Sequence, residues 1–454
     1  MSVASPSSAV QAMQPEWALA AALMGGTRAM RAAGESLLPK WPNEDAKAYA
    51  VRLATATLFP AYQRTVQTLT GKPFSKPIIV GDDVPAQIRP WLDDIDLEGR
   101  NLDTFAAEAM ECALAYGICG ILVEYPNAQG ARTLADERAS GLRPYWVHIK
   151  PEQLLGWRAA RKDGSWVIKQ LRLMETVTEP DGDFGQAAVE QVRVLMPGIW
   201  QTYRKSENGG DWLLHEEGRT SLGYVPFVPV YGQRTDFMCG KPPLLDMAYL
   251  NVQHWQTSSD QQTILHVARV PVLALVGVDD DKFQLTVGAS HAVKLPMGAD
   301  MKYVEHSGAA IEAGRVSIQD LEEQMRQSGA EFLVLDTKMT ATQVVSENSV
   351  GMCALQSMAS KIEDALDLAL QYTADWVSAG EGGHVTLFND YAAGSLSQAS
   401  EQIVLSAQQG GLISKATAIN EMKRRGTLAA EVDPEIEAAM VEGQGPSLGA
   451  DDGQ

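Results

Sequence analysis

Residues 307–376 constrain the fold most, because their pattern is typical of two helices joined by a polar break. In the first helix, apolar residues recur at helical spacing at Ile311, Ile318, Leu321 and Met325. Charged and polar side chains occupy the other faces, so the apolar stripe is narrow. We expect this helix to end at Gly329, since glycine readily takes the left-handed conformation that closes a helix.

A second, longer helix is expected over residues 350–377. Its apolar positions keep a 3.6-residue period, at Leu355, Met358, Ile362, Leu366, Ala369, Tyr372 and Trp376. Side-chain acceptors at residues 346–349 lie near its start. No cluster of catalytic residue types lies along either helix, which favours an oriented structural part. An ordinary helix–loop–helix of a large α-rich enzyme is the alternative that this pattern leaves open.

Composition bounds the class of protein. The chain has 454 residues, enough for two or three domains, and a formal net charge of −20. That charge argues against a basic surface that grips nucleic acid. The four cysteines form no C-x-x-C pair, which predicts buried thiols in a reducing compartment and neither a disulfide frame nor a zinc site. The start is unlike a signal peptide and no apolar run approaches ~18 residues, so we expect a soluble cytosolic protein.

The order of the expected elements indicates a mixed fold. Residues 1–40 are rich in Ala, Ser and Gly and are expected to be loosely ordered. Helices are expected over 43–58 (capped by Asn43), 60–71, 84–95 and 103–116. Short strands separated by turn residues predict an antiparallel meander over 118–124, 145–149, 166–178, 190–196, 200–205, 212–215 and 227–230.

The second half alternates between the two element types. A helix is expected over 243–267, strands over 272–276, 291–295 and 301–304, and then the two helices described above. A strand over 384–388 and helices near 397–408, 415–425 and 434–441 precede a short acidic tail.

The motifs of the common enzyme classes are absent from the sequence. It has no phosphate-binding loop, no dinucleotide fingerprint, no H-E-x-x-H and no nucleophile elbow. The seven histidines are scattered. Asp279, Asp280 and Asp281 are of a type that binds hard cations, but the Gly and Glu of a calcium loop do not follow, so a solvated turn is favoured. We therefore expect no catalytic residue, no metal and no cofactor.

Taken in order from about residue 40 to 425, these elements resemble a tailed-bacteriophage portal protein, in the branch formerly described as a domain of unknown function. The best-matching stretches are LTGKPF at 69–74, AYGICGILV at 115–123, residues 246–260 and residues 340–376. None is a catalytic signature, so the specificity of the resemblance comes from their order and spacing. The short C-terminal region departs from the family and puts a long internal barrel in doubt.

The resemblance implies an α+β portal fold with a β-rich wing, long stem and wing helices and a small mixed α/β clip. The implied parts are a flexible arm (1–40), wing (41–242), stem helix (243–267), clip (268–306), second stem helix (307–329), tunnel loop (330–348), long wing helix with a return strand (349–395), short crown helices (396–442) and a disordered tail (443–454). They would form a ring, usually of twelve copies, in the virion at the capsid portal vertex, assembled in the host cytoplasm.

It also implies the partners and the site residues. The ring would conduct double-stranded DNA during packaging and ejection and dock the terminase large subunit, head–tail connector or adaptor, capsid and scaffolding proteins, without a membrane. DNA would face Lys338, Thr340, Thr342 and Gln343 in the tunnel loop, and a solvent-facing Lys338 is the alternative. The channel wall and subunit contacts would use Gln256, Ser258, Ser259, Glu322, Glu323 and Arg326, and clip docking would use Asp279, Asp280, Asp281 and Lys282.

Two competing functions remain from the sequence. One is a cytosolic hydrolase whose acid/base pair is dispersed along the chain, which no motif supports. The other is a different head–tail adaptor, against which the length of the chain argues.

Overall fold

The computed structural model describes residues 2–126, 142–206, 210–268, 272–276, 300–304, 308–333, 353–389, 391, 405–406, 408–424, 428 and 432–443. The chain divides into two compact units, residues 1–387 and 388–454. The first unit combines helices with several antiparallel sheets, which confirms the expected α+β class. The second contains the helices α12 (Lys415–Arg424) and α13 (Pro434–Gly443).

The first forty residues are helical rather than a loosely ordered arm. They form α1 (Ser8–Met24) and α2 (Gly26–Ala33), followed by a 3-10 turn at Gly34–Ser36. Ser7 caps α1 by accepting a hydrogen bond from the Val10 amide. Met13 and Trp17 are buried with Val10 in a hydrophobic core cluster that contains residues of both larger sheets. Alanine, which suggested a flexible segment, is also the best helix former, and three buried apolar side chains fix the helix in place.

The residues before α1 are also held by the rest of the unit. The Arg172 guanidinium donates to the carbonyl oxygens of Val3 and Ser5, at 2.6 and 2.9 Å. The Ser7 amide donates to the Leu155 carbonyl at 2.8 Å. One backbone hydrogen bond and two from the Arg172 side chain therefore anchor residues 3–7 to the five-stranded sheet.

Three further helices come before the sheets. They are α3 (Ala46–Thr55), α4 (Ala61–Gly71) and α5 (Leu102–Tyr116). Asp45 caps α3 in place of the expected Asn43, which has a positive φ of 64°. The helix expected over 84–95 is only a 3-10 segment at Arg89–Asp93. Pro85 and Pro90 explain the difference, because each removes an amide donor that an α-helix needs.

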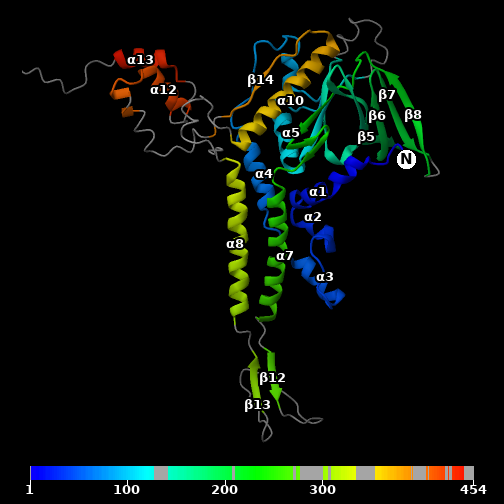
Figure 1. The fold of residues 1–454 in the computed structure, drawn as a ribbon, viewed down its shortest axis with the longest axis vertical. Coiled ribbons are helices and arrows are strands. Elements are labelled where there is room, and N and C mark those ends of the chain that lie inside the picture. The colour runs from blue at the N-terminus through cyan, green and yellow to red at the C-terminus, as the bar shows by residue number, and fades with distance from the viewer. Residues whose placement is uncertain are drawn as a thin grey trace, which may run out of the picture. The chain divides into compact units, whose positions relative to one another are not determined.

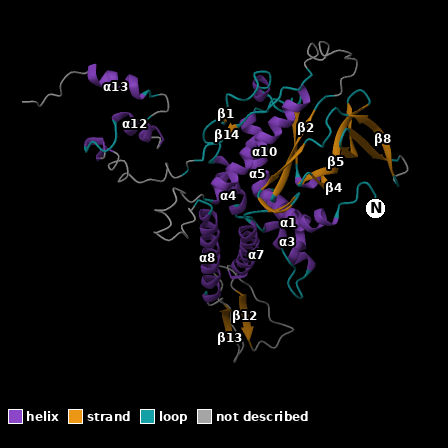
Figure 2. Ribbon diagram, turned by 45° about the horizontal axis from the view of Figure 1, so that its top comes forward, coloured by secondary structure: helices purple, strands orange, loops and turns teal. Residues whose placement is uncertain are grey.

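Two antiparallel sheets make up the β-rich part (Figure 2). The three-stranded sheet has the order β3 (Tyr145–Ile149), β2 (Ile118–Glu124), β9 (Phe227–Tyr231). The five-stranded sheet is a meander of β4 (Leu154–Lys162), β5 (Ser165–Asp181), β6 (Gly185–Met196), β7 (Ile199–Lys205) and β8 (Trp212–Arg219). The expected meander is confirmed for β5 to β8. β4 was not expected, and β2, β3 and β9, which were expected in the same meander, form the separate three-stranded sheet. Both faces of β2 are buried, and Gly120 leaves room there for the Phe227 ring.

Three two-stranded pairs complete the described strands. They are β1 (Ile79–Val80) with β14 (Val385–Thr386), β10 (Gln233–Asp236) with β11 (Cys239–Lys241), and β12 (Val272–Val276) with β13 (Asp300–Val304). The strand expected at 291–295, the tail from residue 444 and most of the helix expected at 397–408 fall outside the described residues.

Three long helices lie in the part with the strongest sequence pattern: α7 (Leu245–Ala268), α8 (Ala309–Glu331) and α10 (Ala354–Val377). The apolar period of α10 is confirmed, since Leu355, Met358, Ile362, Leu366 and Ala369 are buried. It packs against β9 and β2. Cys353, not a residue of 346–349, is its N-cap.

The first of the two predicted helices does not end at Gly329. α8 continues to Glu331, and a Cβ atom at Gly329 would lie 3.2 Å from Thr65 Cγ2. This glycine therefore allows α8 to approach α4 and does not terminate the helix. None of the helices in the described ranges is long and apolar enough to cross a membrane.

Candidate functional site

The antiparallel pair formed by α7 and α8 is the first candidate site. The helices contain 24 and 23 residues, so each is about 36 Å long. They lie side by side and extend away from the sheets, with β12 and β13 beyond their far ends (Figure 1). The register of β12 and β13 runs from Val272 opposite Val304 to Val276 opposite Asp300. We call α7, α8, β12 and β13 the hairpin.

Polar side chains join the two helices of the hairpin. The Gln261 amide donates to the Ile311 carbonyl at 2.8 Å, and Gly314 leaves space for that amide. His254 Nε2 lies 3.4 Å from Glu322 Oε1. These contacts fix the register of α7 against α8.

The predicted apolar stripe of α8 is only partly covered. Leu321 and Met325 are buried, at 5% and 1% exposure. Ile311 and Ile318 are half-buried, whereas Val316, on the face of α8 opposite the stripe, is 43% exposed. One side of α8 thus remains open in the single chain.

The root of the hairpin is attached to the N-terminal helices. The Asn251 side chain accepts from the Tyr62 amide and donates to the Phe59 carbonyl, both at 2.9 Å. Arg52 on α3 forms a buried ion pair with Glu44 at 2.8 Å and lies 3.9 Å from Asp260 on α7. The hydrogen bond from Arg52 lowers the pKa of Glu44. Burial raises the pKa of Asp260.

The predicted wall residues of α7 differ in their surroundings. Gln256 donates to the Leu37 carbonyl at 3.0 Å, so its amide contacts the chain's own N-terminal segment. Ser259 is 3% exposed and its hydroxyl is buried. Ser258 is half-buried. Of these three, Ser258 is the least engaged by the rest of the chain.

The predicted contact residues of α8 pair within one chain. Glu322 faces His254, and Glu323 forms an ion pair with Arg326 one turn away. Glu323 and Arg326 are both exposed, at 51% and 71% of their side-chain area. A contact between subunits at these positions stays a prediction.

Two groups of predicted site residues lie outside the described residues. Lys338, Thr340, Thr342 and Gln343 fall in 334–352, and Asp279, Asp280, Asp281 and Lys282 fall in 277–299.

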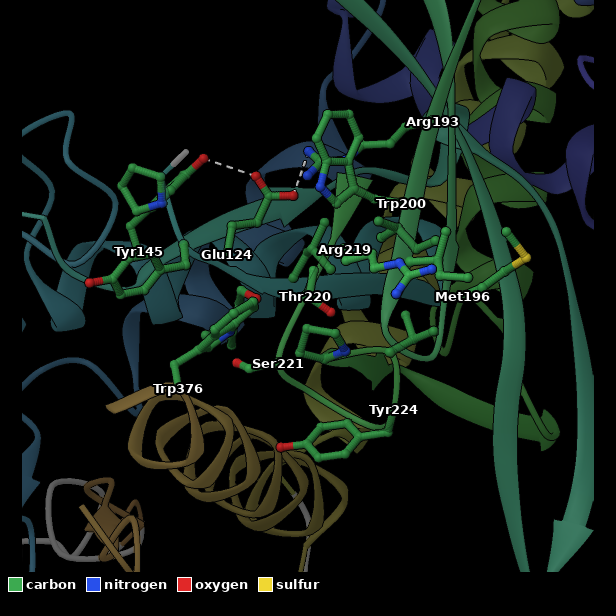
Figure 3. A pocket seen from close by; sticks show the side chains of 18 of the residues that line it. Glu124, Tyr145, Arg193, Met196, Trp200, Arg219, Thr220, Ser221, Tyr224 and Trp376 are labelled. Carbon is green, nitrogen blue, oxygen red and sulfur yellow. Dashed lines mark hydrogen bonds and ion pairs between the residues drawn. The ribbon is translucent and has the colours of Figure 1, made fainter. Parts of the chain in front are cut away.

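A cavity of about 1050 Å³ between the two larger sheets and α10 is the second candidate site. Figure 3 shows Glu124 between Tyr145 and Arg193 at one side of it. Arg193 Nη1 is 2.5 Å from Glu124 Oε1 and 3.4 Å from Glu175 Oε1, and the Tyr145 hydroxyl donates to Glu124 at 2.9 Å. Burial raises the pKa of Tyr145.

Aromatic side chains fix the opposite side of this cavity. The Tyr224 hydroxyl donates to Asp375 of α10, and the Trp376 indole donates to the Val123 carbonyl at 3.1 Å. The carboxylates of Glu124 and Asp375 are thus each held by partners from neighbouring elements. Sequence reasoning missed the cavity because its lining comes from strands and loops that are distant along the chain.

One further group of ligand-type side chains is brought together elsewhere. In the described part of the chain, three metal-ligating side chains lie close together: Cys112, Cys119 and His148. Their spacing in the sequence predicted no metal site.

Sequence comparison matches part of the chain to a known family. Residues 243–377 match the family described as domain of unknown function DUF4055. This range covers the hairpin and α10. No curated protein matches the chain in sequence.

Solved structures of gene transfer agent (GTA) particles are similar to the chain. One is the neck of the native GTA particle computed with C12 symmetry, with 14% identity, 79% of this chain and 88% of that chain covered, and a TM-score of 0.41. Another is the neck of the empty GTA particle computed with C6 symmetry, with 14% identity and a TM-score of 0.43. The match covers 85% of this chain and 95% of that chain. A chain of the virion of the native GTA particle has 13% identity and a TM-score of 0.40. The match covers 87% of this chain and 98% of that chain.

Proposed function

We propose that this chain is a portal protein, whose copies form a ring at one capsid vertex and conduct double-stranded DNA into and out of the particle. The observation that carries the proposal is the hairpin. Two helices of about 36 Å, joined to a body of sheets at one end and to a β-pair at the other, suit the wall of a channel.

The open side of α8 supports assembly into a ring. Val316, which is 43% exposed, leaves apolar surface on the face of α8 opposite its stripe of Ile311, Ile318, Leu321 and Met325. In a closed ring, the hairpin of a neighbouring copy covers this surface, since side-by-side helices pack their ridges into grooves. The family resemblance suggests twelve copies.

The parts of the ring follow the resemblance. α7 and α8 are its stem helices, β12 and β13 belong to the clip, α10 is the long wing helix, and the segments after residue 396 form the crown. The tunnel loop presents Lys338, Thr340, Thr342 and Gln343 to DNA. The clip, with Asp279, Asp280, Asp281 and Lys282, docks the terminase large subunit during packaging and the head–tail connector afterwards.

The charge of the chain suits a conduit. Duplex DNA carries one negative charge per about 1.7 Å of its axis. Basic side chains on the channel wall would therefore bind its phosphates wherever it stood and would oppose its movement. Each copy carries a formal net charge of −20, so the ring repels DNA. At cellular salt concentration this repulsion is weak, because charges more than about 8–10 Å apart are screened from one another. DNA therefore slides without strong binding, and the motor that drives it is a separate protein.

Electron microscopy of the purified chain tests the proposal. The chain is imaged in negative stain alone and co-expressed with the scaffolding protein of its own genome, and its mass is measured by native mass spectrometry. We expect ring particles with a central hole wide enough for duplex DNA. Monomers alone under both conditions, at high concentration, contradict the proposal, and steady ATP turnover by the purified chain favours the hydrolase instead.

A pair of matched variants tests the contact on α8. Val316→Glu places a charge on the open side of α8, whereas Val51→Glu makes the same change on α3, where Val51 is 64% exposed. We expect Val316→Glu to abolish rings and Val51→Glu to leave them, with unchanged helix content in both. If Val316→Glu forms rings as abundantly as the unmodified chain, the contact between subunits does not lie on this face of α8.

A further inference from the structure

Two cysteines and one histidine from three different elements meet beneath the three-stranded sheet. Cys112 lies on α5, Cys119 on β2 and His148 on β3. One ligand atom from each lies within 4.8 Å of the others. The chain reverses between α5 and β2 at Gly117, whose φ of 87° suits glycine, and this reversal brings the two thiols face to face.

The group is enclosed and has an unsatisfied polar atom. Cys112 and Cys119 are 8% and 4% exposed, and all four cysteines of the chain are free thiols. Cys119 Sγ donates to the Ala109 carbonyl at 3.3 Å. His148 Nε2 is buried without a hydrogen-bond partner. A buried nitrogen in that state has lost its hydrogen bond to water, and a bound ligand would give it a partner.

The donor set selects one class of ligand. Two sulfur atoms and an imidazole nitrogen match the preference of Zn²⁺, which binds Cys at about 2.3 Å and His at about 2.0–2.1 Å in tetrahedral geometry. Two thiolates on one such ion are about 3.8 Å apart. The two sulfur atoms, which lie within 4.8 Å of each other, therefore have to approach by about 1 Å or less to hold the ion. Carboxylates, which would favour Mg²⁺ or Ca²⁺, are absent from the set.

A solvent route reaches the group from the side of the histidine. His148 lines a cavity of about 500 Å³ that also contains Glu152 and Lys150. An entering ion would thus meet the imidazole, with the thiols behind it, and water from the cavity would complete the fourth position.

We propose that Cys112, Cys119 and His148 bind one zinc ion, which fastens α5 to β2 and β3. Binding converts the two thiols to thiolates and releases their protons, so that no oxidant or reductant takes part. The site stabilises the body of the unit, and it stands independently of the function proposed for the hairpin.

Metal titration of the full-length chain tests the site. The reduced protein is freed of metal with a chelator and titrated with Co²⁺, and then with Zn²⁺ in competition with a coloured chelator. We expect one ion per chain, sulfur-to-cobalt charge-transfer absorption in the near ultraviolet, and replacement of Co²⁺ by Zn²⁺. Zinc should also slow the reaction of two of the four thiols with a thiol reagent.

Three variants separate this site from adventitious binding. Cys112→Ser and His148→Gln should each weaken Zn²⁺ binding at least about a hundredfold. Cys239→Ser, which removes a half-buried thiol elsewhere, should leave both the affinity and the absorption unchanged. Circular dichroism of the metal-free proteins verifies that each variant folds.

Either of two results overturns the proposal. One is the absence of stoichiometric Co²⁺ and Zn²⁺ binding by the folded, reduced chain. The other is a Cys112–Cys119 disulfide in protein purified without reductant, with a mass lower by two hydrogens and no metal bound.

Discussion

Replacing Asn251 should destabilise the joint between the hairpin and the N-terminal helices. This side chain on α7 is fully buried and is the partner of both the Tyr62 amide and the Phe59 carbonyl. Tyr62 is the second residue of α4, and Pro60 at the N-cap position makes no side-chain hydrogen bond to the helix. Asn251 therefore supplies the cap of α4 from 189 residues away.

The magnitude follows from the two groups that Asn251→Ala leaves without partners. A buried backbone group without its hydrogen bond costs about 1–3 kcal/mol, so the loss of two partners should lower the free energy of unfolding by about 2–6 kcal/mol. Asn251→Leu fills the same space without polar atoms and should be similarly destabilised. Gln253→Ala, at an exposed position of the same helix, should change the free energy by less than about 0.5 kcal/mol.

Urea unfolding followed by tryptophan fluorescence measures these differences, provided that the slope of the transition is unchanged. Hydrogen exchange adds a local measurement, because the Tyr62 amide should be protected in the unmodified chain and exchange faster in both Asn251 variants. If Asn251→Leu is as stable as the unmodified chain, the loss in Asn251→Ala comes from an empty cavity, and the argument from unpaired groups is refuted.

Two further predictions concern α10 and β14. Thr373→Val should lower the free energy of unfolding by about 1–3 kcal/mol in urea titrations, because the buried Trp146 indole loses the hydroxyl that it bonds at 2.8 Å, whereas Thr373→Ser should lose less than half as much. The hydrogen bond to Asp83 raises the pKa of His384, so the pair's stabilising effect is complete below the ordinary histidine pKa and disappears as the pH rises through the raised value. Asp83→Asn should return the pKa of His384 toward 6.5 in an NMR titration, and an unchanged pKa would mean that Asp83 is not the cause.

Local pattern was sufficient for the elements that bury one regular face. The strands 118–124, 145–149 and 272–276 were predicted to the residue, because β-branched and apolar runs between turn residues have few other conformations available. α10 followed from its apolar period for the same reason. The class of the fold rests on these elements.

Predictions from composition were wrong where a segment distant in the sequence determines the local structure. The alanine-rich start was expected to be loose, yet Val10, Met13 and Trp17 are buried against strands more than a hundred residues away. Gly329 suggested a helix end, but its lack of a side chain serves contact with Thr65. In both cases the neighbour that gives the residue its role is not adjacent in sequence.

The sequence by itself determined the α+β class, the two helices of the hairpin, the apolar face of α10 and a strongly negative net charge. Only the tertiary structure decided that Asn251 caps α4, that charges pair inside a cavity between two sheets, and that Cys112, Cys119 and His148 meet. The physical reason is the distance in sequence over which each interaction acts. Periodicity and capping act over a few residues, whereas satisfying a buried polar group or gathering ligands depends on which distant segments the packed core brings together.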